Sequence, residues 1–205
     1  MSILWVYAAG REGEPWAGDP RMLQLGVGKV AATLALARGL SEQRPEAVVV
    51  FGVAGAHPGG PAVGEPCWVV DDWLADEGVM TPAGFVPLEA LGLGRRGPLR
   101  ADAGFTDRLD AALGGGLPRV VGATVSTCSG TDHQAELSRA ACPQALVETM
   151  EGAAVGTVCD ALGIAWAQLR VISNRTGDRE AAGWDLDGAL ACLHPMVHRL
   201  LTALD

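Results

Sequence analysis

The sequence predicts an α/β protein: a single-domain three-layer sandwich with a mixed, largely parallel central sheet flanked by helices. Short apolar runs, typical of strands buried on both faces, alternate along the chain with segments of helical periodicity. The 205 residues, 49% of them hydrophobic, are enough for one domain with a sizeable core. Because no repeat or change of composition marks a boundary, residues 1–205 are expected to form one domain.

The first half of the chain contains apolar runs that predict strands and an Ala/Leu-rich segment that predicts a helix. These elements are, in order, a strand at 3–9, a short strand at 22–27, a helix that develops from 26–32 and ends near Leu40, and strands at 47–53 and 66–72. Gly and Pro between the first two strands predict a loop. Gly55 is expected to interrupt the strand at 47–53, because glycine weakens a strand.

The second half continues the alternation of helices and strands. Its elements are, in order, a helix at 105–113, a strand at 119–127, a helix at 133–141, a strand at 145–150, a helix at 152–162, a strand at 165–173 and a helix from about 186 to 203. Glycines at 114–116 end the first of these helices. The helix at 152–162 has Ala153, Val158 and Leu162 at helical spacing.

Composition and charge exclude several classes of function. A net charge of −9 argues against general nucleic-acid binding, which requires a basic surface. No stretch approaches the roughly 20 apolar residues of a membrane helix, and residues 1–10 lack the basic start of a signal peptide. The five cysteines form no CxxC pair and no Cys/His cluster, so we expect reduced thiols, a cytoplasmic protein and no metal site.

Three polar residues stand near the carboxyl ends of predicted strands, where ligands bind in such sheets: Glu12, Glu151 and Asn174. Glu151 suits the adjacent hydroxyls of a ribose, and Glu12 suits a general base for water. The Asn174 amide can both donate to and accept from a base. Each also has an ordinary explanation: a glutamate that complements a helix dipole, a solvated loop glutamate and an asparagine that ends a strand.

The order of these three residues, taken with two glycine-containing segments, resembles the purine nucleoside phosphorylase/nucleosidase superfamily over nearly the whole chain. The segments are 26–32 (Gly-Val-Gly-Lys-Val-Ala-Ala) and 52–56 (Gly-Val-Ala-Gly-Ala), and residues 150–154 (Met-Glu-Gly-Ala-Ala) are equally similar. Within the superfamily, the chain is most similar to the methylthioadenosine/S-adenosylhomocysteine nucleosidases and, among these, to the futalosine hydrolase group. Residues 76–79 (Asp-Glu-Gly-Val) and 81–85 (Thr-Pro-Ala-Gly-Phe) add that last similarity.

The resemblance implies a nucleoside phosphorylase-like fold and cleavage of a purine N-glycosidic bond without a cofactor. For the futalosine hydrolase group, the reaction releases hypoxanthine and dehypoxanthine futalosine in menaquinone biosynthesis. Glu12 would orient or deprotonate water, Glu151 would bind the ribose 2′- and 3′-hydroxyls, and Asn174 would face the base. The other residues that the resemblance places around the substrate are Met150 and Thr149, Val53, Ala54 and Gly55, and the base-reading segment Ser129, Gly130 and Thr131.

Two departures from the family pattern refine this expectation. Where phosphorylases carry an arginine and a hydroxyl, this chain has Val50 and Val53, which cannot compensate a buried phosphate dianion. Residues 18–21 (Gly-Asp-Pro-Arg) are similar to a phosphate-binding turn, but Arg21 alone is insufficient. Asn174 stands where adenine-specific nucleosidases have an aspartate, and an amide suits hypoxanthine or guanine. Water and a 6-oxopurine nucleoside are therefore predicted.

The 5′ substituent of futalosine ends in a benzoate and requires an apolar, partly cationic pocket. Arg175, Arg179 and Trp184 are predicted to line or close it; the alternative is a surface loop with ordinary exposed arginines. The family is commonly dimeric or larger, so a homo-oligomer is expected, with Trp68 and Trp73 as possible interface residues. Three other functions remain open: a phosphorolytic phosphorylase, a methylthioadenosine/S-adenosylhomocysteine nucleosidase and a purine-binding module without activity.

Overall fold

The computed structural model describes residues 1–179 and 183–204. Within these ranges the strands are β1 (Ile3–Tyr7), β2 (Met22–Gln24), β3 (Ala47–Ala56), β4 (Pro66–Leu74), β5 (Gly78–Thr81), β6 (Gly84–Pro87), β7 (Leu99–Arg100), β8 (Arg119–Thr124), β9 (Val147–Thr149) and β10 (Ala165–Arg175). The α-helices are α1 (Gly10–Gly13), α2 (Lys29–Glu42), α3 (Ala103–Leu113), α4 (Asp132–Ala141), α5 (Gly152–Leu162) and α6 (Leu186–Leu204). Short 3₁₀ helices are η1 (Glu14–Trp16) and η2 (Leu88–Leu91).

The central sheet is mixed, as predicted, and it also closes on itself. Its strand order is β10-β4-β8-β9-β3-β1-β2, and β10 pairs with β3 as well as with β4. Strands β10, β4, β8, β9 and β3 therefore form a closed ring of hydrogen-bonded neighbours, from which β1 and β2 extend. The β3–β10, β1–β3, β4–β8 and β8–β9 pairs are parallel, whereas β3–β9 and β4–β10 are antiparallel. The sequence analysis did not predict the closure.

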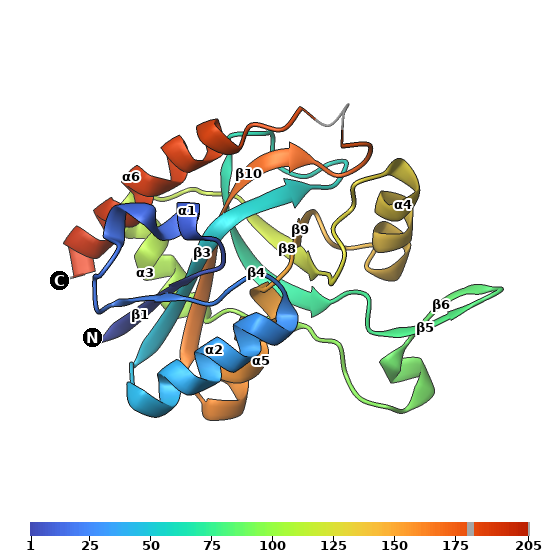
Figure 1. Ribbon diagram of the computed structural model, residues 1–205, viewed down its shortest axis with the longest axis horizontal. Coiled ribbons are helices and arrows are strands. Elements are labelled where there is room, and N and C mark those ends of the chain that lie inside the picture. The colour runs from blue at the N-terminus through green and yellow to red at the C-terminus, as the bar shows by residue number, and fades with distance from the viewer. Residues whose placement is uncertain (180–182, 205) are drawn as a thin grey trace.

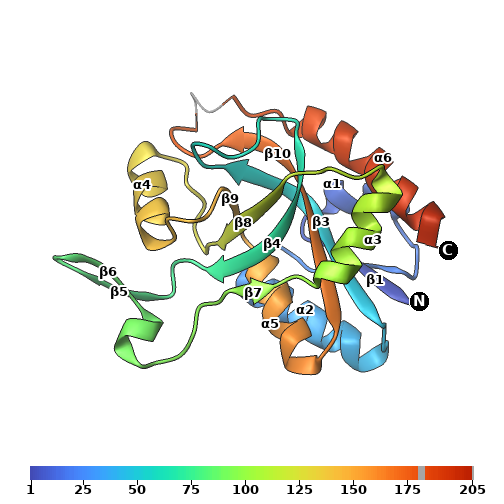
Figure 2. The same cartoon turned by 180° about the vertical axis from the view of Figure 1, so that it is seen from behind.

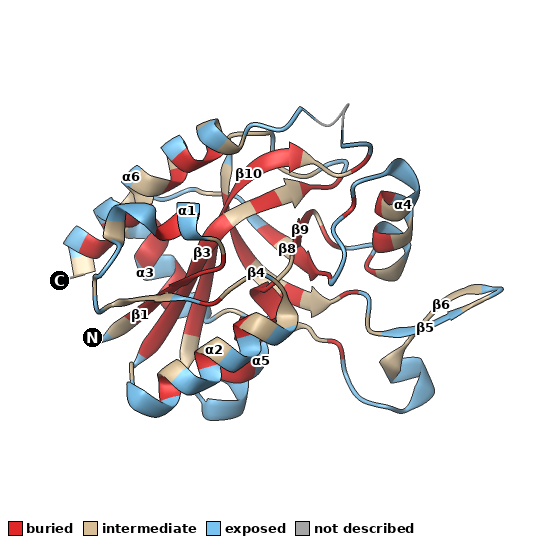
Figure 3. Ribbon diagram, viewed as in Figure 1, coloured by how far each residue is buried: buried red, intermediate tan, exposed pale blue. Residues whose placement is uncertain are grey.

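Helices cover both faces of the sheet, which confirms the three-layer prediction (Figures 1 and 2). Helices α3 and α6 pack on one face of β3 and β10, around a cluster that includes Phe51 and Leu169. Helices α2 and α5 pack together on the other side, around a cluster that includes Leu36 and Val50. The long strands are buried along most of their length in Figure 3, as expected for strands covered on both faces.

The predicted elements occur at the expected places, with differences near the carboxyl ends of strands. Strand β3 continues through Gly55 to Ala56, so the predicted interruption is wrong. Strand β10 extends to Arg175, with a register shift between Ile172 and Asn174. Here the β3–β10 pairing continues past the predicted ends and outweighs the weak strand preference of glycine.

Several short regions were not predicted as regular structure, η2 and β7 among them. Residues 10–16, expected to be a loop, contain the single turn α1 and then η1. Strands β5 and β6 form a hairpin that stands away from the body of the molecule (Figures 1 and 2). Among the described residues, no helix has the length and apolar character needed to cross a membrane.

Trp68 is wrongly predicted as an interface residue. Its side chain is 0% exposed within the cluster under α3 and α6, and its Nε1 donates to Asp110 Oδ1 at 3.0 Å. Trp73 is partly buried, with the Arg96 guanidinium 5.9 Å from its ring centroid. A large aromatic ring on a strand of this sheet is buried by the protein's own helices, which the sequence pattern alone did not reveal.

Candidate active site

A cavity of about 370 Å³ lies at the carboxyl ends of β1, β3, β9 and β10. Its lining contains nearly all of the predicted site residues. The lining residues are Ala8, Ala9, Glu12, Val27, Val53, Ala54, Gly55, Cys128, Ser129, Gly130, Glu148, Thr149, Met150, Glu151, Ser173, Asn174, Arg179 and Trp184. Segments from distant parts of the sequence therefore meet here, as the rule for ligand sites in α/β sheets predicts.

Glu12 is a buried carboxylate fixed by backbone amides. The chain turns into α1 directly after β1, and this turn folds the Glu12 side chain back over the end of the strand. Glu12 Oε2 accepts from the amides of Ala8 and Ala9 at 3.0 and 2.9 Å, and Oε1 accepts from the Val53 amide at 2.9 Å. With 5% exposure, Glu12 is not the solvated loop glutamate of the alternative explanation.

Glu151 immediately precedes α5 and is also buried, at 5% exposure. Its Oε1 accepts from the Gly28 amide at 2.9 Å, which joins the start of α2 to the start of α5. Burial raises the pKa of Glu151, the Arg170 guanidinium and the Gly28 amide oppose that rise, and the negative charge of Glu12 adds to it. The two carboxylates thus influence each other within one cavity.

Arg170 connects the two carboxylates and was missed by the sequence analysis. It lies on β10 with 1% exposure, its Nη1 donates to the Val53 carbonyl at 3.3 Å, and its Nη2 is 3.9 Å from Glu151 Oε2. The Arg170 Nε and Nη2 atoms have no hydrogen-bond partner among the described residues. An arginine inside a mostly apolar predicted strand was the signal that could have revealed it, since a buried charge needs partners.

Gly52 provides the space in which these charges meet. A Cβ atom at this position would lie 2.3 Å from Glu12 Oε1 and 2.7 Å from Arg170 Nη1. Any larger residue would therefore push the carboxylate or the guanidinium away. The glycine on β3 is needed for close approach and not for an unusual backbone conformation.

Asn174 stands on the other side of the cavity, at 6% exposure. Its Oδ1 accepts from the Ser173 hydroxyl at 2.9 Å, and its Nδ2 donates to the Arg175 carbonyl at 2.8 Å. A Cβ at Gly55 would lie 3.2 Å from Asn174 Nδ2, so the glycine leaves room beside the amide. The amide retains one proton and further acceptor capacity that can meet a ligand.

Glu148 is a second buried residue of the lining that the sequence analysis assigned no role. It is 4% exposed and accepts from the Ser129 amide at 2.7 Å, the Ser129 hydroxyl at 2.6 Å and the Ser138 hydroxyl at 2.9 Å. These bonds join β9 to the 126–131 segment and to α4. Its place on an unusually short strand gave no hydrophobic pattern by which to recognise it.

The structure brings together most, but not all, of the predicted substrate-binding residues. Arg179 and Trp184 both line the cavity, and the Arg179 guanidinium lies 4.4 Å from the Trp184 ring centroid. Thr131 does not line it: its hydroxyl accepts from the Gln134 amide and caps α4. Arg175 also lies outside the lining, with Nη1 donating to the Gly60 carbonyl at 3.2 Å.

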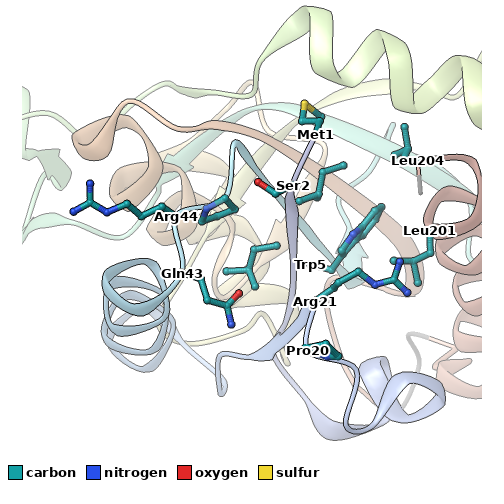
Figure 4. A pocket seen from close by; sticks show the side chains of 12 residues that line it. Met1, Ser2, Trp5, Pro20, Arg21, Gln43, Arg44, Leu201 and Leu204 are labelled. Carbon is teal, nitrogen blue, oxygen red and sulfur yellow. The ribbon is translucent and has the colours of Figure 1, made fainter.

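The residues considered for phosphate do not form a phosphate site at this cavity. Val50 is 1% exposed in the cluster under α2 and α5, and the Val53 amide is bonded to Glu12. Arg21 pairs with Asp19 at 2.8 Å and lines a separate cavity of about 420 Å³ (Figure 4). That cavity lies at the start of β1 and the ends of α2 and α6, away from the carboxyl ends of the strands.

Within residues 1–179 and 183–204, no group of three or more His, Cys, Asp or Glu side chains is arranged to hold a metal ion. The candidate active site is therefore described by its own side chains and backbone amides. At one end of the site are two buried carboxylates, Glu12 and Glu151, with the Arg170 guanidinium beside them. At the other end are the Asn174 amide and the Glu148 carboxylate.

The sequence and the fold match a known class of proteins. The model of the phosphorylase superfamily matches residues 11–202, and the chain belongs to that family. Within it, the chain is 43% identical to the futalosine hydrolase of Thermus thermophilus, over 87% of this chain and 80% of the relative. It is 38% identical to the futalosine hydrolase of Acidothermus cellulolyticus, over 82% and 70% of the two chains.

Solved structures agree on the fold. The structure of the 5′-methylthioadenosine/S-adenosylhomocysteine nucleosidase of Neisseria meningitidis, in complex with methylthio-immucillin-A, superposes with a TM-score of 0.81 and covers 100% of both chains. Its sequence identity to this chain is 18%, so this similarity concerns the fold. The prediction of a nucleoside phosphorylase-like α/β fold is confirmed.

Proposed function

We propose that this chain hydrolyses the N-glycosidic bond of futalosine and releases hypoxanthine and dehypoxanthine futalosine, a step of menaquinone biosynthesis. The observation that carries the proposal is that Glu12, Glu151 and Asn174 line one cavity, with the buried Arg170 guanidinium beside Glu151. The two futalosine hydrolases at 43% and 38% identity support the choice of substrate. No cofactor enters the proposed reaction.

The reaction separates charge along the bond between C1′ of the ribose and N9 of the purine. As this bond lengthens, the ribose becomes positive and the purine becomes negative. Glu151 binds the 2′- and 3′-hydroxyls with Met150 packed beneath the sugar, and its negative charge favours the positive ribose. Glu12 accepts a proton from the water that attacks C1′, a role that contributes roughly 10²–10⁴-fold.

Arg170 keeps the carboxylates in place. Its charge offsets the repulsion between Glu12 and Glu151. At the other end, the Asn174 amide donates to the 6-oxo group of the departing purine anion. N7 of this anion takes a proton from solvent water, and the amide oxygen accepts a hydrogen bond from the resulting N7–H. Ser129 and Gly130 contribute backbone contacts near the base, and Val53, Ala54, Gly55 and Thr149 complete the proposed substrate site.

Charge in the cavity favours water over phosphate as the nucleophile. Three carboxylates (Glu12, Glu148 and Glu151) line the cavity, whereas Arg179 is the guanidinium in its lining and Arg170 contacts Glu151. A phosphate dianion brought beside these carboxylates would be repelled and poorly compensated. Arg179 and Trp184 are instead assigned to the benzoate-bearing 5′ substituent, which needs a cation and an apolar surface.

The proposal includes a cytoplasmic homodimer or larger homo-oligomer. Helix α2 exposes Val30 at 83% and Leu34 at 59%, four residues apart on one side of the helix, and Val27 before it is 58% exposed. An apolar stripe of this kind is typical of a subunit contact. A monomer observed by light scattering at micromolar concentration would contradict this part.

Product analysis tests the reaction directly. The purified protein is incubated with futalosine, inosine, adenosine or methylthioadenosine, with and without phosphate, and the free base is separated by chromatography. Hypoxanthine released from futalosine without phosphate is the expected result. Adenine release would favour a methylthioadenosine/S-adenosylhomocysteine nucleosidase, a requirement for phosphate would favour a phosphorylase, and binding without any release would favour a purine-binding module.

A further inference from the structure

Glu148 lies level with Asn174 across three neighbouring strands. Gly55 of β3 pairs with Asn174 of β10 on one side and with Glu148 of β9 on the other. Residues directly opposite each other in a sheet point to the same face, and all three line the cavity. Since neighbouring strands are about 4.8 Å apart, the two polar residues stand roughly 10 Å apart with the side-chain-free Gly55 between them.

The Glu148 carboxylate is held as a hydrogen-bond acceptor. Its contacts are donors: the Ser129 amide, the Ser129 hydroxyl and the Ser138 hydroxyl. A carboxylate accepts about four hydrogen bonds, so it retains capacity for one more donor from the cavity. Its Oε1 accepts one of these bonds and its Oε2 accepts two, which leaves Oε1 the less occupied atom.

The two classes of purine differ at the edge that a buried acceptor would meet. A 6-oxopurine carries a proton on N1 beside its carbonyl, whereas N1 of a 6-aminopurine is an acceptor. A carboxylate facing N1 therefore accepts a hydrogen bond from a 6-oxopurine. With a 6-aminopurine, the carboxylate and N1 are both acceptors, so the two buried groups face each other unpaired. Asn174, on the opposite side of Gly55, is placed to meet the O6 and N7 edge of the same ring.

We propose that Glu148 is a specificity-determining residue that accepts the N1–H of a 6-oxopurine and excludes 6-aminopurines from the site. The inference rests on the proposed function, since it assigns a base to the nucleoside that the carboxylates cleave. It adds a charged partner to Asn174 and makes the choice of base depend on two residues from different strands. Glu148 takes no part in the attack of water.

The test compares Glu148→Gln with Ser138→Ala, using futalosine and its 6-amino counterpart. The glutamine keeps the shape of the side chain and an oxygen for the Ser129 and Ser138 hydroxyls. Its NH₂ group takes the place of Oε1, loses the bond from the Ser129 amide and suits an acceptor at N1. We expect kcat/KM for futalosine to fall about 10²-fold or more and the 6-oxo to 6-amino ratio to fall about 10³-fold. Ser138→Ala loosens one anchor but keeps the carboxylate, so this ratio should remain within about threefold.

Calorimetry of free bases provides a readout that is independent of catalysis and reports folding of the variants. The unchanged protein should bind hypoxanthine at least about 10²-fold more tightly than adenine or 1-methylhypoxanthine, and Glu148→Gln should lose the preference over adenine. An unchanged base ratio in Glu148→Gln, or an equal change in Ser138→Ala, would overturn the inference and leave Glu148 as an anchor of the 126–131 segment. If the unchanged protein cleaves no futalosine, the proposed function fails, while the binding ratios still decide the role of Glu148.

Discussion

The two ends of the cavity are built from different kinds of group. At the ribose end, two carboxylates surround one guanidinium, and backbone amides from three segments hold the carboxylates in place. At the base end, Asn174 and Glu148 flank Gly55, and they are held mainly by serine hydroxyls, with one backbone amide and the Arg175 carbonyl. The ribose end depends on backbone geometry, and the base end depends on exchangeable side chains.

This difference separates the reaction from the choice of substrate. Backbone amides fix Glu12 and Glu151 wherever the fold is intact, so any nucleoside with a ribose meets the same groups there. A few side-chain substitutions at the base end can change which purine is accepted without moving the carboxylates. Substitutions at the ribose end should therefore affect all substrates alike, whereas substitutions at the base end should change ratios between substrates.

The largest effect is expected for Glu12→Gln. Loss of the group that accepts a proton from water should lower kcat for every substrate by about 10³-fold, and hypoxanthine binding should stay within a few-fold. Steady-state kinetics and base calorimetry measure the two quantities. Glu14→Gln is a matched control two residues away on an exposed side chain and should leave kcat unchanged. A parallel loss of hypoxanthine binding would remove the distinction between the two ends.

Asn174→Asp should alter the base end alone. The carboxyl group loses the NH₂ donor to the 6-oxo group, so kcat/KM for futalosine should fall about 10²-fold relative to that for the 6-amino counterpart. A competition assay with both substrates in one reaction gives this ratio directly. If both substrates lose activity equally, Asn174 acts on the ribose end and the separation proposed above is wrong.

A smaller effect is expected for Arg179→Ala. Removing the guanidinium from the Trp184 ring and from the 5′ substituent should raise KM for futalosine about tenfold at nearly constant kcat. Inosine, which lacks the substituent, should show no change in kcat/KM. Arg175→Ala is the matched control, because Arg175 lies outside the cavity lining. An equal increase of KM for inosine would place Arg179 at the base or ribose instead.

The smallest effect on activity, but a pH-dependent effect on stability, is expected for Asp72→Asn. Burial raises the pKa of Asp72 from 3.8 to about 6, so the folded state holds more protons than the unfolded chain between these values. Stability from this group is present below about pH 4 and is lost as the pH rises through about 6. The loss is on the order of 3 kcal/mol at neutral pH.

Urea unfolding at about pH 4.5 and pH 8 measures this contribution. Asp72→Asn should raise the free energy of unfolding at pH 8 by up to about 3 kcal/mol relative to the unchanged protein, and by much less at pH 4.5. Its kcat should stay within about twofold, since Asp72 does not line the cavity. An equal increase in the free energy of unfolding at both pH values would mean that burial of the Asp72 charge does not cause the stabilisation.

Much of the fold and part of the site could be predicted from the sequence. The alternation of apolar runs and helical segments predicted the order of the main elements, because burial on both faces imposes that pattern. Glu12, Glu151 and Asn174 were found because they follow or end apolar runs. Arg170 and Glu148 were missed, because each lies within a strand and only the pairing across strands places it beside the other site residues.

Closure of the ring could not be predicted for the same reason. Register between strands depends on contacts between residues far apart in the sequence, and local periodicity does not contain them. Trp68 illustrates the limit: the sequence shows a large aromatic residue, and only α3 and α6 packed over it explain its burial. Exposure of a residue on a strand follows from the layer above it.

The closed ring also determines when this site can appear during synthesis. Strand β10 pairs with β3 across the intervening residues 57–164, so the ring can be completed only after residues 1–175 have left the ribosome. Until then Glu12 and Glu151 lack the cation that Arg170 brings, and the base end lacks Asn174. We therefore expect nascent and truncated chains without β10 to be inactive, with cleavage of nucleosides beginning only when β10 has docked.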